Sequence, residues 1–147
     1  MELVSEAIAF AVKAHDGMRR KKSESPYILH PMEVASIVGS MTTDEEIIAG
    51  AALHDVVEDT NITFADLAKT FPQDVLDILR LLTHDEHVDY FDYIRQIKTN
   101  PIAVKVKLAD IEHNSNEARC TGSDLPPEKL LYWKEKYTKA RAILMHE

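Results

Sequence analysis

The sequence predicts an all-α fold, formed by about eight helices in a single domain that spans residues 1–147. Three observations support this prediction. The chain has four glycines and is rich in Ala, Leu, Ile, Glu and Lys, a balance that favours helix. Apolar residues recur at helical spacing along most of the chain. No segment shows sustained alternation of polar and apolar residues or an Asn-Gly hairpin turn, so a sheet is not expected.

The expected helices can be followed along the chain from their apolar residues and their ends. Ala7 and Phe10 share one helical face and predict a first helix that ends near Gly17. The polar stretch over 19–26 is predicted to be a loop. A second helix is expected from about Pro31, because proline suits the first turn of a helix.

A third helix is expected to be capped by Thr42 or Thr43 and to run through the apolar segment 47–53 to His54-Asp55. The remaining helices are expected from the capping box Thr63-Phe-Ala-Asp66, from Pro72, and over 89–98, 102–119 and 127–145.

The composition argues against several classes of function. With 17 Lys and Arg against 25 Asp and Glu, the net charge of −8 disfavours a protein that coats nucleic acid. Positive charge is concentrated in the run Arg19-Arg20-Lys21-Lys22, which suits either a phosphate contact or a solvated loop. The single cysteine, the lack of a signal-peptide pattern and the lack of a long apolar run predict a cytoplasmic protein without a membrane partner. The oligomeric state is left open.

The chemistry is expected around one of three His-Asp dipeptides. His54-Asp55 ends the apolar segment 47–53 and is followed, after two valines, by Glu58-Asp59. Four ionisable side chains at the end of a buried helix are costly unless an opposite charge compensates them. No Lys or Arg is adjacent, so a divalent cation is the favoured compensating charge. The alternative is an exposed helix end that carries scattered acids.

Two further positions offer ligands for such a cation. His30 follows a short apolar segment, and Asp110 closes an apolar helical stripe. Either residue alone is more often a hydrogen-bonded core residue than a ligand. With His54 and Asp55 they form a two-histidine, two-aspartate set, which suits Mn²⁺, Fe²⁺ or Mg²⁺ and leaves coordination positions open for water.

Three strings of residues carry a family resemblance: Tyr27-Ile-Leu-His30-Pro, His54-Asp-Val-Val-Glu-Asp-Thr60 and Val106-Lys-Leu-Ala-Asp110-Ile-Glu-His-Asn114. Over about 11–119 the chain resembles the hydrolase domain of RelA/SpoT homologues. Given its length, it is most similar to the stand-alone small alarmone hydrolases. The resemblance implies an all-α HD-type fold that uses Mn²⁺ to remove the 3′-pyrophosphate of (p)ppGpp, which yields GDP or GTP and pyrophosphate.

The resemblance also implies roles for individual residues. Glu58 and Asp59 match the pair that positions and deprotonates the attacking water. Arg20 and Lys21 match a pair that packs against guanine and contacts phosphate, and Asn114 matches an asparagine that faces the ribose and phosphates. The implied metal ligands are His30, His54, Asp55 and Asp110.

The chain departs from the family pattern at several positions. The basic loop is one residue longer and lacks the usual glycine, so Arg19, Arg20 or Lys21 is a candidate for the residue that stacks on the base. Glu117 places an acid where it would be unfavourable beside phosphate, which puts the nucleotide identity in question. His84 stands where the family usually has a lysine.

Other polar and aromatic residues are given structural roles. The His84-Asp-Glu-His87 cluster is interpreted as an exposed turn, with a second metal site as the alternative. His15, His113 and His146 are interpreted as structural or surface residues, with His113 a candidate for the pocket rim. The tyrosines and Trp133 are assigned to packing, with an aromatic platform for the base as the alternative.

Two alternative functions stay open. One is an HD-type phosphohydrolase that acts on another nucleotide, such as an adenosine alarmone or NADPH. The other is a nucleotide-binding regulatory module without turnover. The presence of Glu58-Asp59 favours an enzyme, because a binding module has no need of a water-activating pair.

Overall fold

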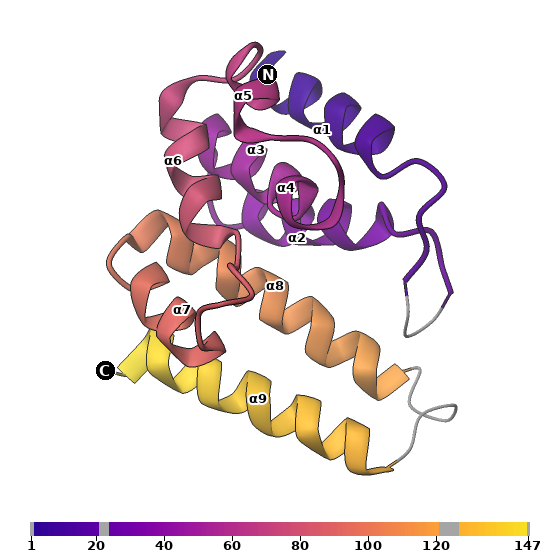
Figure 1. Ribbon diagram of the computed structural model, residues 1–147, viewed down its shortest axis with the longest axis vertical. Helices are drawn as coiled ribbons and strands as arrows, with labels where there is room; N and C mark the ends of the chain where they lie inside the picture. Colours follow the sequence, from indigo (N-terminus) through magenta and orange to yellow (C-terminus); the bar gives the residue numbers. More distant parts are fainter. Residues whose placement is uncertain (1, 21–23, 121–126, 147) are drawn as a thin grey trace.

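We describe a computed structural model, which covers residues 2–20, 24–120 and 127–146, without the side chains of 116–120 and 130. These ranges contain nine helices and no strand (Figure 1), so the prediction of an all-α fold is confirmed. No helix in them is long and apolar enough to cross a bilayer. The helices are α1 (Glu2–Ala14), α2 (Leu29–Gly39), α3 (Glu45–Leu53), α4 (Val56–Asp59), α5 (Phe64–Ala68), α6 (Gln73–Leu82), α7 (Tyr90–Ile97), α8 (Pro101–Cys120) and α9 (Pro127–His146).

Helix α3 is the centre of the fold. Every residue from Ile47 to Leu53 is buried, and α1, α2 and α6 surround the helix. Small side chains allow this crowding: a Cβ atom added at Gly50 would lie 3.3 Å from Cγ2 of Ile78 on α6. A helix that is apolar on all sides belongs in the core, so its last residues deliver His54 and Asp55 into the interior of the molecule.

The helix ends differ from the sequence predictions in three places. Helix α2 begins at Leu29 rather than Pro31, which puts His30 inside its first turn. Helix α3 is capped by Asp44, not by Thr42 or Thr43, because the Asp44 carboxylate accepts a 3.0 Å hydrogen bond from the Glu46 amide. Helix α1 ends at Ala14, before Gly17.

Helix α4 is a single turn that follows α3 almost directly. Val56 is buried, whereas Glu58 and Asp59 are exposed. Thr60 ends the turn: its hydroxyl donates to the Val56 carbonyl at 2.6 Å and accepts from the Ile62 amide at 3.1 Å. The predicted capping box at the start of α5 is also present.

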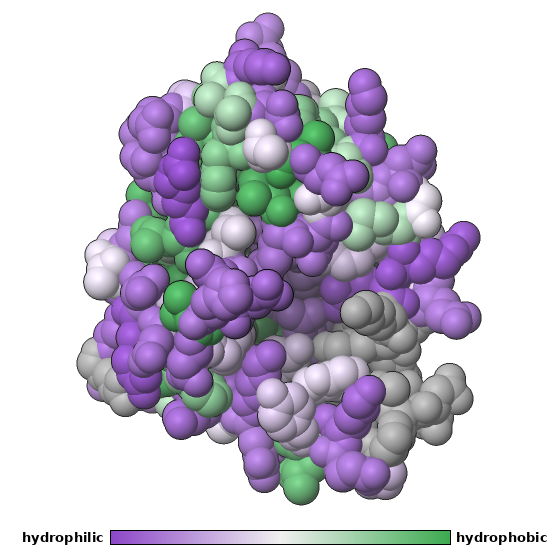
Figure 2. Space-filling model, viewed as in Figure 1, coloured by the Kyte–Doolittle hydropathy of each residue, from purple (hydrophilic) through white to green (hydrophobic). Residues whose placement is uncertain are grey.

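The remaining helices form the other side of the molecule. Helices α8 and α9 lie side by side below α2 and α3, and α7 packs against both (Figure 1). Helix α8 also contacts α2, so the start of α2, the end of α3 and the middle of α8 meet. Figure 2 shows this face of the molecule hollowed and hydrophilic near its middle, between the upper helices and the α8–α9 pair.

Candidate metal centre and active site

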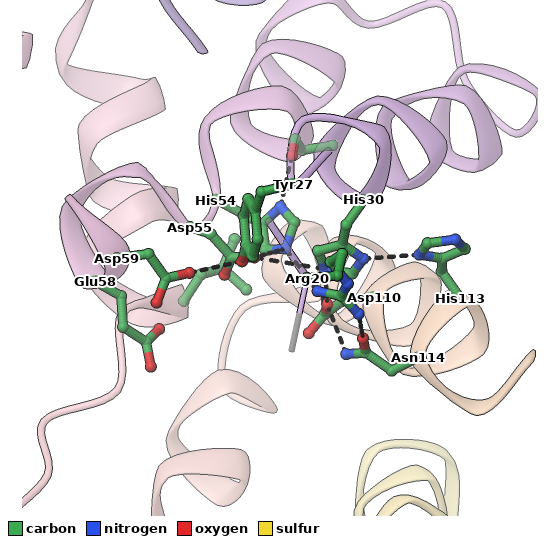
Figure 3. Close-up of polar contacts among 12 residues, drawn as sticks. Arg20, Tyr27, His30, His54, Asp55, Glu58, Asp59, Asp110, His113 and Asn114 are labelled. Carbon is green, nitrogen blue, oxygen red and sulfur yellow. Dashed lines mark hydrogen bonds and ion pairs between the residues drawn. The ribbon is translucent and has the colours of Figure 1, made fainter. Parts of the chain in front are cut away.

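Four side chains from three parts of the chain converge where α2, α3 and α8 meet (Figure 3). One ligand atom from each of them lies within 4.8 Å of the others, and this is the only such group found among the described residues. His30 Nε2 lies 2.8 Å from Asp110 Oδ1, and His54 Nε2 lies 3.0 Å from Asp55 Oδ2. The structure therefore brings together all four predicted metal ligands.

The donor set fits a divalent cation. Two imidazole nitrogens and two carboxylate oxygens face a common point, a mixture that Mn²⁺, Fe²⁺ and Mg²⁺ accept. His54 Nε2 is buried, and no described residue gives it a hydrogen bond of good geometry, although Asp55 Oδ2 is near. A buried nitrogen without a hydrogen bond is costly. Coordination of a cation would satisfy it.

The two histidines are held in place by different partners. His54 Nδ1 lies 2.7 Å from the Ala51 carbonyl oxygen, so this nitrogen donates and the Nε2 lone pair faces the centre. His30 Nδ1 lies 2.7 Å from Nδ1 of His113, and the two rings are stacked with centroids 5.0 Å apart. For Nε2 of His30 to act as a ligand, its Nδ1 donates and His113 accepts. His113, predicted as structural or at the rim, thus orients a candidate ligand.

Charge pairing keeps the carboxylates ionised. Burial raises the pKa of Asp110, but Lys107 and the histidines lower it further, so the net pKa lies well below its usual range. Asp55 behaves likewise, with His54 as the main opposing charge. Burial lowers the pKa of His54 and of His30, but the two carboxylates raise it by more, so both histidines have raised pKa values.

A second layer of polar contacts surrounds Asp110. Lys107 Nζ lies 2.8 Å from Asp110 Oδ2. On the other side, the Asn114 amide donates to Asp110 Oδ1 at 3.1 Å and accepts from the Arg20 guanidinium at 2.7 Å. The predicted pair Asp110 and Asn114 therefore does share one face of α8, and Arg20 reaches it across 94 positions of sequence.

Glu58 and Asp59 lie at the opposite end of the site, one turn beyond Asp55 (Figure 3). Both are exposed at the mouth of the site. Partial desolvation and the charge of Asp55 nevertheless raise the pKa of Glu58 to about 7 and also raise the pKa of Asp59. A carboxylate with a pKa near neutrality is suited to exchange protons with water or substrate.

The structure separates the basic candidates. Arg20 is buried and faces the site, and its guanidinium carbon lies 5.4 Å from the centre of the Tyr27 ring. Arg19 is exposed and donates to the Glu24 carbonyl within the same loop. Lys21 lies outside the described residues, and so does the side chain of Glu117.

Two interpretations from sequence need correction. Tyr27 is more than a packing residue, because its hydroxyl lies 2.8 Å from Asp55 Oδ2 and 2.6 Å from Asp59 Oδ2. The sequence did offer an indication of this role, because Tyr27 begins the string Tyr27-Ile-Leu-His30-Pro that carries the family resemblance. The 84–87 cluster is exposed only in part: its first residue, His84, is half-buried and stacked on Tyr93.

Comparison with known proteins identifies the family. Residues 7–112 match the HD domain. The chain belongs to the HD domain family. It is 40% identical over 128 residues to the guanosine-3′,5′-bis(diphosphate) 3′-pyrophosphohydrolase MESH1 of Xenopus tropicalis, a match that covers 81% of this chain and 72% of that protein.

Other relatives agree with this assignment. The bifunctional (p)ppGpp synthase/hydrolase SpoT of Escherichia coli is 33% identical over 135 residues, which is 84% of this chain but 18% of that protein. The structure of a metazoan ortholog of SpoT that hydrolyzes ppGpp superposes with a TM-score of 0.86 at 29% identity, and covers 99% of this chain and 87% of that one.

Family membership confirms two predictions made from sequence. The chain is an HD-type hydrolase of the RelA/SpoT group, similar to the stand-alone members, and it is a metal-dependent phosphohydrolase. HD domains bind a divalent metal, and the cluster of His30, His54, Asp55 and Asp110 could hold one. The roles of individual residues stay predictions.

Proposed function

We propose that this protein hydrolyses the 3′-pyrophosphate of (p)ppGpp, with one Mn²⁺ held by His30, His54, Asp55 and Asp110. The observation that carries the proposal is the convergence of these four ligand atoms one turn away from an exposed acidic pair. The activities named for MESH1 and for the metazoan SpoT ortholog support the choice of substrate.

The bound cation would lower the pKa of a water molecule and polarise a phosphoryl oxygen. Glu58 and Asp59 would orient the attacking water and accept its proton. A bond forms from the water oxygen to phosphorus while the bond from phosphorus to the ribose 3′-oxygen breaks. The 3′-oxygen takes up a proton, and the products are GDP or GTP and pyrophosphate.

The other end of the site would bind the nucleotide. Arg20 and Asn114 lie beside Asp110 and opposite Glu58 (Figure 3), so a substrate held by them would extend across the ligand set. A guanidinium offers paired donors to phosphate oxygens and a flat face to a base. This local positive charge reconciles an acidic protein with a polyanionic substrate.

The test is product identification. Purified protein is incubated with ppGpp and Mn²⁺, and the products are separated by anion-exchange chromatography. We expect GDP and pyrophosphate in equal amounts, and no turnover after the metal is removed by a chelator. Parallel reactions with Mg²⁺ and Fe²⁺ identify the preferred cation. Release of orthophosphate, or inactivity with all three metals, would contradict the proposal.

A different nucleotide is the second candidate, and His84 is the observation that favours it. His84 stands where the family usually has a lysine, and its Nε2 lies 2.7 Å from the Val88 carbonyl oxygen. Its ring stacks on Tyr93, so it does not offer a mobile cation to a phosphate. The same assay with an adenosine alarmone and with NADPH tests this candidate. Cleavage of either in place of ppGpp would keep the metal chemistry and change the substrate.

A further inference from the structure

We infer that Tyr27 is a positioning residue with two separable functions: its hydroxyl sets the position of Asp59, and its ring sets the position of Arg20. The inference rests on the proposed function, because it concerns the same hydrolysis. Tyr27 lies in the segment before α2, at the junction of the cation ligands, the acidic pair and the basic loop (Figure 3).

The hydroxyl bridges two carboxylates. It lies 2.8 Å from Asp55 Oδ2 and 2.6 Å from Asp59 Oδ2, and these oxygens belong to a candidate ligand and to the acidic pair respectively. The hydroxyl carries a single proton, so it donates to one of these two oxygens at a time, and its place between them links Asp59 to Asp55. Asp59 is exposed and belongs to a single helical turn, so α4 alone fixes it weakly. The phenol is the group that joins Asp59 to the interior of the site.

The ring contacts two other side chains, His15 and Arg20. The His15 ring lies 4.8 Å from it, centroid to centroid, and the Arg20 guanidinium carbon lies 5.4 Å from its centre. His15 and Arg20 are both buried. A guanidinium over an aromatic face is attracted to it, so the ring helps to place the side chain that we assign to the nucleotide.

Two substitutions separate these functions. Tyr27→Phe keeps the ring and removes the hydroxyl, so we expect kcat to fall about tenfold, as for loss of one hydrogen bond to a charged group, with KM nearly unchanged. Tyr27→Leu removes both, so we expect the same loss in kcat and, in addition, a KM raised about tenfold. Tyr93→Phe is the matched control, because it removes a buried tyrosine hydroxyl that donates to the Leu82 carbonyl.

A double-mutant cycle tests whether the hydroxyl acts through Asp59. In Tyr27→Phe/Asp59→Ala, kcat should equal that of Asp59→Ala alone, because the hydroxyl then has nothing to position. Titration of the metal-free protein with Mn²⁺ by calorimetry should show a smaller loss of affinity than of kcat for Tyr27→Phe, although the hydrogen bond to Asp55 is lost as well. Additive losses in kcat, or a Mn²⁺ affinity that falls as much as kcat, would overturn the inference and place the hydroxyl's role on Asp55.

Urea unfolding tests the contact without any catalysis. It is measured for the four proteins of the cycle: wild type, Tyr27→Phe, Asp59→Ala and the double variant. We expect the effect of Tyr27→Phe on the unfolding equilibrium constant to differ about fivefold between the wild-type and the Asp59→Ala backgrounds. If wild-type protein does not cleave ppGpp, the proposed function fails while this measurement still tests the link from Tyr27 to Asp59. Independent effects on unfolding would overturn the inference even if ppGpp is cleaved.

Discussion

The two ends of the site are built in different ways. His30, His54 and Asp110 are buried on or beside helices of 9 to 20 residues, and each has a further contact that fixes its orientation. Glu58 and Asp59 are exposed on a single turn of helix, and each has one longer-range contact, from the His84 amide and the Tyr27 hydroxyl respectively. The four side chains that could hold a cation therefore belong mainly to the folded core, whereas the acidic pair to which we assign water activation lies at its edge. Substitutions at the two ends should separate metal content from turnover.

The largest effect is expected at the buried end. His54→Ala should abolish both Mn²⁺ binding and turnover, because no described side chain can replace this imidazole in the core. Metal analysis of the purified variant and the ppGpp assay measure the two losses. His87→Ala, an exposed histidine, is the control and should keep both properties. Full Mn²⁺ occupancy in His54→Ala would remove it from the ligand set.

At the exposed end, substitutions should reduce turnover and leave the metal bound. Glu58→Gln and Asp59→Asn should retain Mn²⁺ while kcat falls about 100-fold, as when a general base is removed. Metal content and steady-state kinetics are measured on the same samples, with the exposed Glu86→Gln as the control. Unchanged turnover in both variants would exclude the pair from the mechanism.

At the end of the site that we assign to the nucleotide, the expected effect is intermediate. Arg20→Ala should raise KM for ppGpp about tenfold to a hundredfold and lower kcat less, because a lost charge-assisted contact weakens binding and leaves the acidic pair in place. Steady-state kinetics measure both constants. Arg95→Ala on α7 removes an exposed arginine that pairs with Asp92 and serves as control. A fall in kcat at constant KM would show that Arg20 acts on the reaction step instead.

The two candidate histidine ligands, His30 and His54, can be compared within the buried end. The acceptor for His54 is the backbone carbonyl of Ala51, which a side-chain substitution does not remove, whereas the acceptor for His30 is the side chain of His113. His113→Phe keeps a stacked ring and removes the acceptor, so Mn²⁺ affinity should fall about tenfold. Calorimetric titration measures it, and equal affinity in wild type and variant would refute an orienting role for His113.

The smallest expected effect concerns the pH dependence of turnover. A raised pKa means that Glu58 is protonated below about pH 7 and becomes a base only above it. Turnover should therefore rise with pH through this region, and the positive charge of a bound cation would move the inflection lower. A pH–rate profile measures this rise in turnover, which should disappear in Glu58→Gln. An unchanged rise in that variant would assign it to another group.

The sequence predicted those parts of the molecule that depend on local pattern. The all-α fold and the HD family are confirmed, and the four candidate ligands do meet. His54, Asp55 and Asp110 end or follow an apolar helical stripe, and His30 follows a short apolar segment. The contacts of Tyr27 and His113 were missed because they join residues 28, 32 and 83 positions apart. A helix period carries no information on such pairs.

Local chemistry also explains the errors at helix ends. Asp44 and both preceding threonines are good capping residues, and only the folded backbone selects among them. The start of α2 was placed two residues late because proline marks the first turn of a helix but does not fix which position of that turn it takes.

The single turn of α4 has a consequence for how the protein fails when heated. Helix α3 is enclosed on all sides and should exchange its amide hydrogens with deuterated solvent only when the whole domain unfolds. The amides of Glu58 and Asp59 sit in a turn held by Val56, by the Thr60 hydroxyl and by Tyr27, and local opening is enough to expose them. Catalytic capacity should then disappear several degrees below the melting transition. A calorimeter would still report an intact molecule at a temperature where the enzyme no longer works.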